Sequence, residues 1–152
     1  MRYSLTRAYI LTFVIKAGGA LPVLVIDGAA FSDFEGFARE FSSLLDDYTW
    51  YGNLDAFNDI LRGGFGTPED GWVLRWLNSE LSRDALGHEA TARRLDGLLA
   101  TCHPANRARI EAEIARAHRG QGPTLFDQIV GIIRDHGPGG TESEDGILLE
   151  LV

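Results

Sequence analysis

Asp55 and Asp59 are the acidic residues of this chain whose spacing best indicates a shared role. If Asn53 caps a helix, the two carboxylates stack one turn apart on one side of it. The apolar residues of the same segment fall on another side; they are Leu54, Phe57, Ile60 and Leu61. Like charges at this spacing destabilise an isolated helix by a few tenths of a kcal/mol. The pair therefore suits a solvated surface, and it gains most from a partner that presents arginines or lysines.

Catalysis by the same two carboxylates is an alternative, because paired acids can hydrolyse glycosides. The surrounding sequence does not favour it. No apolar segment next to the pair would keep one acid protonated, and Arg62, one turn on, favours the ionised form. The four histidines are far apart in the sequence, and Cys102 lacks the spacing of a metal ligand or a nucleophile. We therefore predict no catalytic residue, no metal and no cofactor, and an enzyme of unknown type is the last alternative.

Composition limits the class of protein. With 152 residues, of which 45% are hydrophobic, the chain can bury one core, so residues 1–152 are predicted to form a single domain. A net charge of −8 argues against direct nucleic-acid binding and suits a basic protein partner. A single cysteine, Cys102, favours a reducing compartment, the cytoplasm. The apolar run 8–15 is closed by Lys16 and is too short to span a membrane, so we predict no membrane association.

Three segments are predicted to form buried parallel strands, because they are short and rich in apolar or β-branched residues; they are 23–26, 72–76 and 147–151. A further strand, 9–15, precedes the turn-like segment 17–22 and is predicted to pair antiparallel with 23–26.

Helices are predicted between these strands. Apolar residues recur at helical spacing over 34–45, where Ser32 and Glu35 form a capping-box pattern, and again over 126–136, after a capping Thr124. A helical hairpin is predicted between Gly87 and Gly122. The loop 138–146 is rich in glycine and acidic residues, and we expect it to be mobile and solvated.

The segment from Trp50 to Asp59 resembles the signature of the barstar family, intracellular inhibitors of small secreted ribonucleases. That signature is aromatic-Tyr-Gly, then Asn-Leu-Asp-Ala, an aromatic or aliphatic residue, and Asp. With the strands and helices outside the hairpin, the resemblance covers roughly two thirds of the chain. The N-terminal extension 1–22 and the segment 82–123 have no counterpart in the short family members.

The resemblance implies an α/β fold: a small three-stranded parallel sheet packed with helices, here with an extra N-terminal strand and an inserted helical hairpin. It also implies inhibition of a basic ribonuclease, with the acidic helix and the preceding aromatic loop over the active site. The implied partner-binding residues are Trp50, Gly52, Asn53, Asp55 and Asp59. Asp59 matches a known hot-spot position of the family. A barstar-like module for a different basic partner is the alternative, and the oligomeric state is left open.

The chain departs from the family pattern near this segment. No acidic residue stands between Gly52 and Asn53, Asn58 replaces an aromatic residue, and Arg62 adds a positive charge to the helix. The hairpin between His88 and Arg119 carries six arginines against four acidic residues. Because this excess opposes the charge of the acidic helix, we predict that residues 88–123 lie outside the main contact surface.

Overall fold

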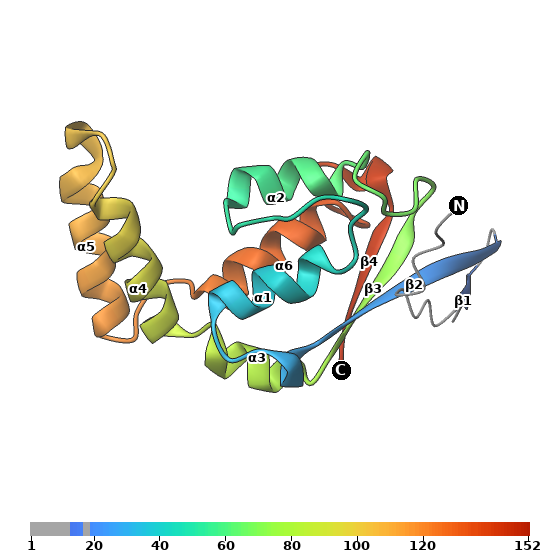
Figure 1. Ribbon diagram of the computed structural model, residues 1–152, viewed down its shortest axis with the longest axis horizontal. Helices are drawn as coiled ribbons and strands as arrows, with labels where there is room; N and C mark the ends of the chain where they lie inside the picture. The colour runs from blue at the N-terminus through green and yellow to red at the C-terminus, as the bar shows by residue number, and fades with distance from the viewer. Residues whose placement is uncertain (1–12, 17–18) are drawn as a thin grey trace.

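The fold is an α/β fold built on one four-stranded sheet, seen in a computed structural model that describes residues 13–16 and 19–152 (Figure 1). The strands stand in the order β1-β2-β3-β4, and their bounds are Phe13–Lys16, Gly19–Asp27, Trp72–Leu77 and Ile147–Leu151. β1 pairs antiparallel with β2, whereas β2, β3 and β4 are parallel. The predicted three-stranded parallel sheet is confirmed. The first residues of the predicted N-terminal strand, 9–12, lie outside the described residues.

Helical crossovers connect the parallel strands, as this topology requires. Between β2 and β3 the chain forms α1 (Phe34–Ser42) and α2 (Leu54–Leu61). Between β3 and β4 it forms α3 (Ser79–Ala85), α4 (His88–Leu99), α5 (Arg107–His118) and α6 (Leu125–Asp135). Short 3-10 turns occur at Gly28–Ala30, Pro104–Asn106 and Ser143–Asp145.

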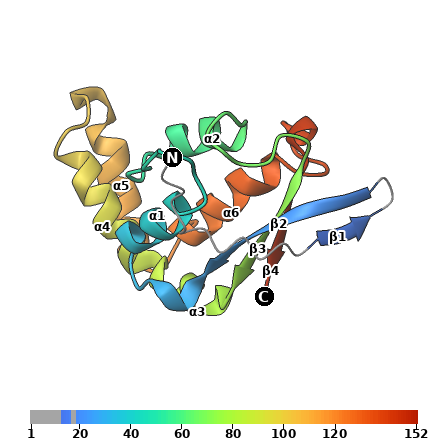
Figure 2. The same cartoon turned by 45° about the vertical axis from the view of Figure 1, so that its right-hand side comes forward.

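The core lies between the sheet and α1, α2 and α6, which cover one of its faces (Figures 1 and 2). Alternate residues of the central strand, Trp72, Leu74 and Trp76, point into it and are at most 1% exposed. The facing helices contribute mainly aromatic and branched side chains; among them are Phe37, Phe41, Phe57, Ile60, Phe126, Ile129 and Ile133. This arrangement leaves the polar side of α2 at the surface.

The helical hairpin α4–α5 projects from the rest of the molecule (Figure 1). Its base is held by two hydrogen bonds at the start of α6: Leu125 N–H donates to Thr91 Oγ1 at 2.8 Å, and Phe126 N–H to the Leu86 carbonyl at 3.0 Å. The hairpin was predicted, but α3 was not. The buried side of α3 includes Ser79 and Ser82, so it carries little hydrophobic pattern.

Two local predictions need correction, and one is confirmed. The first helix ends at Ser42 and is capped by Asp33, whose carboxylate accepts from Gly36 N–H at 2.7 Å; Ser32 is not the cap. The last strand is only partly buried, because β4 is an edge strand that pairs with β3 alone. Thr124 caps α6 as predicted, within a capping box that includes Asp127. In the described part of the chain, no helix has the length and apolar character needed to cross a membrane.

Candidate functional site

The acidic helix α2 begins at the predicted cap. The Asn53 side chain accepts a hydrogen bond from Ala56 N–H at 3.0 Å, which satisfies one of the free donors of the first turn. Gly52, just before it, has a φ of +99°, which L side chains rarely adopt. The sharp turn at Gly52 therefore aims the chain into the helix.

Trp50 supports this turn from within the core. Its side chain is 2% exposed and packs against the rings of Phe37 and Phe57, with centroid distances of 5.9 and 4.9 Å. The indole Nε1–H donates to the Asn53 carbonyl at 2.8 Å. The resemblance implied Trp50 as a contact residue, but its indole is not at the surface of the free protein. Its visible role is to hold the loop 51–53 in place.

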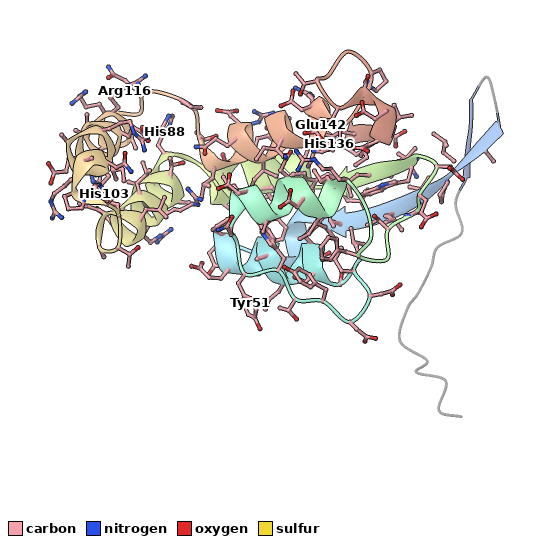
Figure 3. All side chains as sticks on the ribbon, turned by 90° about the horizontal axis from the view of Figure 1, so that it is seen from above. Tyr51, His88, His103, Arg116, His136 and Glu142 are labelled. Carbon is pink, nitrogen blue, oxygen red and sulfur yellow. The ribbon has the colours of Figure 1, made fainter. Side chains whose placement is uncertain are left out.

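Tyr51 is the exposed aromatic residue of the loop. Its side chain is 91% exposed and points away from the body of the protein (Figure 3). It belongs to the sequence motif but was not among the candidate contact residues. No local signal in the sequence separates the two residues, because Trp50 and Tyr51 are adjacent and aromatic, and packing alone buries one and exposes the other.

Asp55 and Asp59 both lie on the exposed side of α2, opposite the buried Phe57, Ile60 and Leu61. Asp55 stands in the first turn, where the helix dipole favours a negative charge. Asp59 is not a free carboxylate, however: it forms an ion pair with Arg62, and the two side chains are 62% and 48% exposed. The structure thus places the loop at the N-terminal end of α2 and both aspartates, one turn apart, on its exposed side.

Arg62 also binds a residue that the sequence analysis did not connect with this helix. Its Nε and Nη2 atoms donate to the two carboxylate oxygens of Glu142, each at 2.6 Å. These hydrogen bonds lower the pKa of Glu142 from 4.5 to about 2. Because the folded-state pKa is depressed, this ion pair stabilises the protein above about pH 4.5. The contribution is lost as the pH falls from there towards 2.

A buried histidine joins α2, α6 and the loop 138–146. His136 is 0% exposed; its Nδ1 lies 2.6 Å from Asp145 Oδ2 and its Nε2 lies 2.7 Å from Asn58 Oδ1. Figure 3 places His136 beside Glu142. The predicted solvated loop is thus tied to the body through Glu142 and Asp145, whose side chains are 26% and 19% exposed. Such contacts between distant segments leave no local sequence signal.

His136, Glu142 and Asp145 also have the residue types of a metal site. Each offers one ligand atom, and these atoms lie within 4.8 Å of one another. The same atoms already bind protein groups, since Asp145 contacts His136 and Glu142 binds Arg62. The group acts here as a hydrogen-bonded link.

Helix α4 borders the loop 51–53, whereas α5 lies beyond it. A groove with a volume of about 410 Å³ is lined by the start of α1, by residues 51–53 and by α4, with Arg93 and Arg94 on the α4 side. The Arg94 guanidinium lies 5.8 Å from the centre of the Phe34 ring. Burial lowers the pKa of Arg94, and the negative charge of Asp55 opposes that shift. The first helix of the hairpin therefore lies nearer the acidic surface than the sequence predicted.

Replacing Gly52 by alanine is expected to destabilise the protein by about 1–2 kcal/mol, because an L residue is strained at this φ. The new Cβ would also lie 2.9 Å from Phe34 Cε1. Urea unfolding measures the change. Gly97→Ala in α4 is the matched control, since a Cβ there meets no atom within 4 Å, and it should be neutral or stabilising. Equal stability of the two variants would contradict the strained turn.

An exposed tyrosine close to exposed carboxylates forms a surface that suits recognition of a basic protein. The chain belongs to the barstar family: the family model described as Barstar (barnase inhibitor) matches residues 21–119. The match runs from within β2 to the end of α5, and α6 and β4 lie beyond it. No curated protein and no solved structure matches the chain significantly.

Proposed function

We propose that the chain inhibits a basic, barnase-type ribonuclease by placing α2 and the loop before it across the enzyme's active site. Family membership supports the inhibitory role. The observation that carries the mechanism is the pair of exposed aspartates on one side of α2. A ribonuclease must attract the phosphates of RNA, so its active site is cationic. Carboxylates held on a rigid helix occupy that site in place of phosphate and exclude the substrate.

The proposed contact residues are Gly52, Asn53, Asp55 and Asp59, and we add Tyr51. Tyrosine is enriched at binding hot spots because it gives a large contact area at a small entropic cost. Trp50 takes part through its backbone and by holding the loop. This division follows from exposure, which is 2% for Trp50 and 91% for Tyr51.

Charge is expected to speed the association. The chain has a net charge of −8, so it attracts a basic enzyme over distances of about a Debye length. We place the inhibitor in the cytoplasm, since its single cysteine suits a reducing compartment. The partner on this proposal is a protein, with no direct contact to nucleic acid or membrane.

The chemistry of the acidic surface favours binding over turnover. A general acid in an enzyme needs a carboxyl group whose pKa is raised. Glu142, which forms a bidentate contact with Arg62, has a pKa lowered by that arginine. A group held in its ionised form suits electrostatic recognition.

The proposal is tested by inhibition assays with purified barnase-type ribonucleases, including any that the host genome encodes. We expect RNA cleavage to fall in proportion to added inhibitor and to stop at a one-to-one ratio. The inhibition should weaken as the salt concentration rises, because charge pairs drive the association. Full ribonuclease activity at saturating inhibitor, across the whole set, would contradict the proposal.

A pull-down from the native host separates the proposal from its alternative, a module for another basic protein. A captured ribonuclease supports inhibition. A captured basic protein without ribonuclease activity, which binds the purified chain and is released by Asp59→Ala, supports the alternative.

The far helix of the hairpin is expected to lie outside the interface. Arg107 and Arg109 on α5 form exposed ion pairs with Glu111 and Glu113. Reversing both arginines to glutamate should change ribonuclease binding by no more than about 1 kcal/mol, as for charges at a rim. Titration calorimetry measures the binding, and a thermal melt checks the fold. A larger loss of affinity with an unchanged melting temperature would mean that the hairpin is part of the interface.

A further inference from the structure

In the free protein, Arg62 lies between two carboxylates, those of Asp59 on α2 and Glu142 in the loop 138–146. One arm of its guanidinium, Nη1, pairs with Asp59 Oδ1, while Nε and Nη2 form a bidentate contact with Glu142 at 2.6 Å. Two carboxylates thus converge on a single guanidinium, one from a residue 3 positions before Arg62 and one from a residue 80 positions after it. Such a planar, bidentate arrangement is the geometry by which carboxylates recognise arginine.

The position of Glu142 does not depend on Arg62 alone. Its backbone N–H donates to the Asp135 carbonyl at 2.8 Å, which ties it to the end of α6. The next support is the buried His136, bound on one side to Asp145 and on the other to Asn58 of α2. Glu142 Oε2 lies 3.9 Å from His136 Nδ1. Because His136 in turn contacts Asn58 of α2, the Glu142 carboxylate should stay near Asp59 when the arginine is removed.

The ion pair between Arg62 and Asp59 is open to competition. Both side chains are about half exposed, at 48% and 62%. Exposed pairs of this kind contribute only about 0–1 kcal/mol. A partner that desolvates the surface can therefore displace the contact of Arg62 with Asp59 at small cost. The bidentate contact with Glu142, whose side chain is 26% exposed, has to be made again by the partner's own cation.

We propose that Arg62 is an internal competitor: it fills the place between Asp59 and Glu142 that an arginine or lysine of the partner takes in the complex. This inference rests on the proposed function. In the free protein Arg62 offsets one of the two negative charges of Asp59 and Glu142, and on binding it turns towards solvent. Arg62 thereby limits affinity and selects for partners whose cation reaches both carboxylates.

The first test needs no partner and uses methylguanidinium as the probe. We expect it to bind the Arg62→Ala variant and to shift the carboxyl carbon signals of Asp59 and Glu142 in NMR spectra. Binding should be lost in Arg62→Ala combined with Glu142→Gln. Wild-type protein should show no saturable shift. In Arg62→Ala the pKa of Glu142 should also rise from about 2 towards 4.5, which checks that Arg62 is its partner in solution. Absence of methylguanidinium binding to Arg62→Ala would overturn the proposal.

The second test measures affinity for a ribonuclease that the wild-type chain inhibits. Arg62→Gln should bind roughly two- to fivefold more tightly, the range that corresponds to losing an exposed competing ion pair. Arg109→Gln is the matched control: it removes one positive charge and one exposed ion pair, on α5, and should leave affinity unchanged.

Failure of the competitor role of Arg62 can be distinguished from failure of the proposed inhibitory function. Weaker binding by Arg62→Gln, together with a loss for Asp59→Ala, would show that Arg62 positions Asp59 and would overturn the competitor role alone. If Asp59→Ala binds as well as wild type, the proposed function fails, and the inference falls with it.

Discussion

Asp59→Ala should weaken ribonuclease binding by at least about 2 kcal/mol, roughly a 30-fold rise in Kd. On the proposed function, the Asp59 carboxylate meets an arginine or lysine of the partner in a desolvated contact. Removing it leaves that cation buried without its counter-charge, which is costly. The free protein should lose only a few tenths of a kcal/mol, because the side chain is 62% exposed and its pair with Arg62 is a surface pair.

Titration calorimetry against the ribonuclease, with a thermal melt of each free variant, checks this result. Glu80→Ala is a suitable control, since it also removes an exposed i,i+3 ion pair, with Arg83 on α3. The double variant Asp55→Ala/Asp59→Ala should lose less than the sum of the single losses, because both carboxylates address one cationic cleft. Unchanged affinity for Asp59→Ala would remove α2 from the interface even though the fold is that of the family.

Trp50→Ala should lower the free energy of unfolding by about 3–5 kcal/mol, the usual cost of deleting a buried large aromatic side chain. The indole is 2% exposed and packs edge-on or tilted against Phe37, Phe41 and Phe57. The variant also loses the hydrogen bond from Nε1 to the Asn53 carbonyl, which anchors the turn into α2. Trp50→Phe keeps most of the packing and should cost less.

Urea unfolding measures both variants, and Tyr51→Ala is the neighbouring control. Tyr51 is 91% exposed, so its replacement should leave stability within about 0.5 kcal/mol while weakening ribonuclease binding. The Kd of Trp50→Phe for the ribonuclease should stay within about tenfold of the wild-type value, because Trp50 affects binding only by holding the loop 51–53 in place. A Trp50→Phe variant of normal stability that no longer binds would mean that the indole leaves the core to contact the partner.

Local patterns in the sequence were sufficient to predict the sheet and most helices. The parallel strands β2, β3 and β4 follow from short apolar segments separated by crossover-length connections, and α2 follows from the capping Asn53 and its apolar stripe. Each depends on residues within a few positions of one another, where propensity, capping and periodicity act. Where the apolar pattern is weak, as in α3 with its buried serines, prediction failed.

The exposure and the hydrogen-bond partners of the site residues depend on contacts that form only when the chain folds. Tertiary packing buries Trp50 and exposes Tyr51, although both are aromatic and adjacent. It also brings Glu142 to Arg62 across 80 positions and His136 to Asn58 across 78. Hydrogen bonds between residues so far apart in the sequence leave no pattern in it, because the packing of α2, α6 and the last loop decides which side chains meet. The acidic pair and the nearby Arg62 could therefore be predicted from the local sequence, while the contact of Arg62 with Glu142 required the fold.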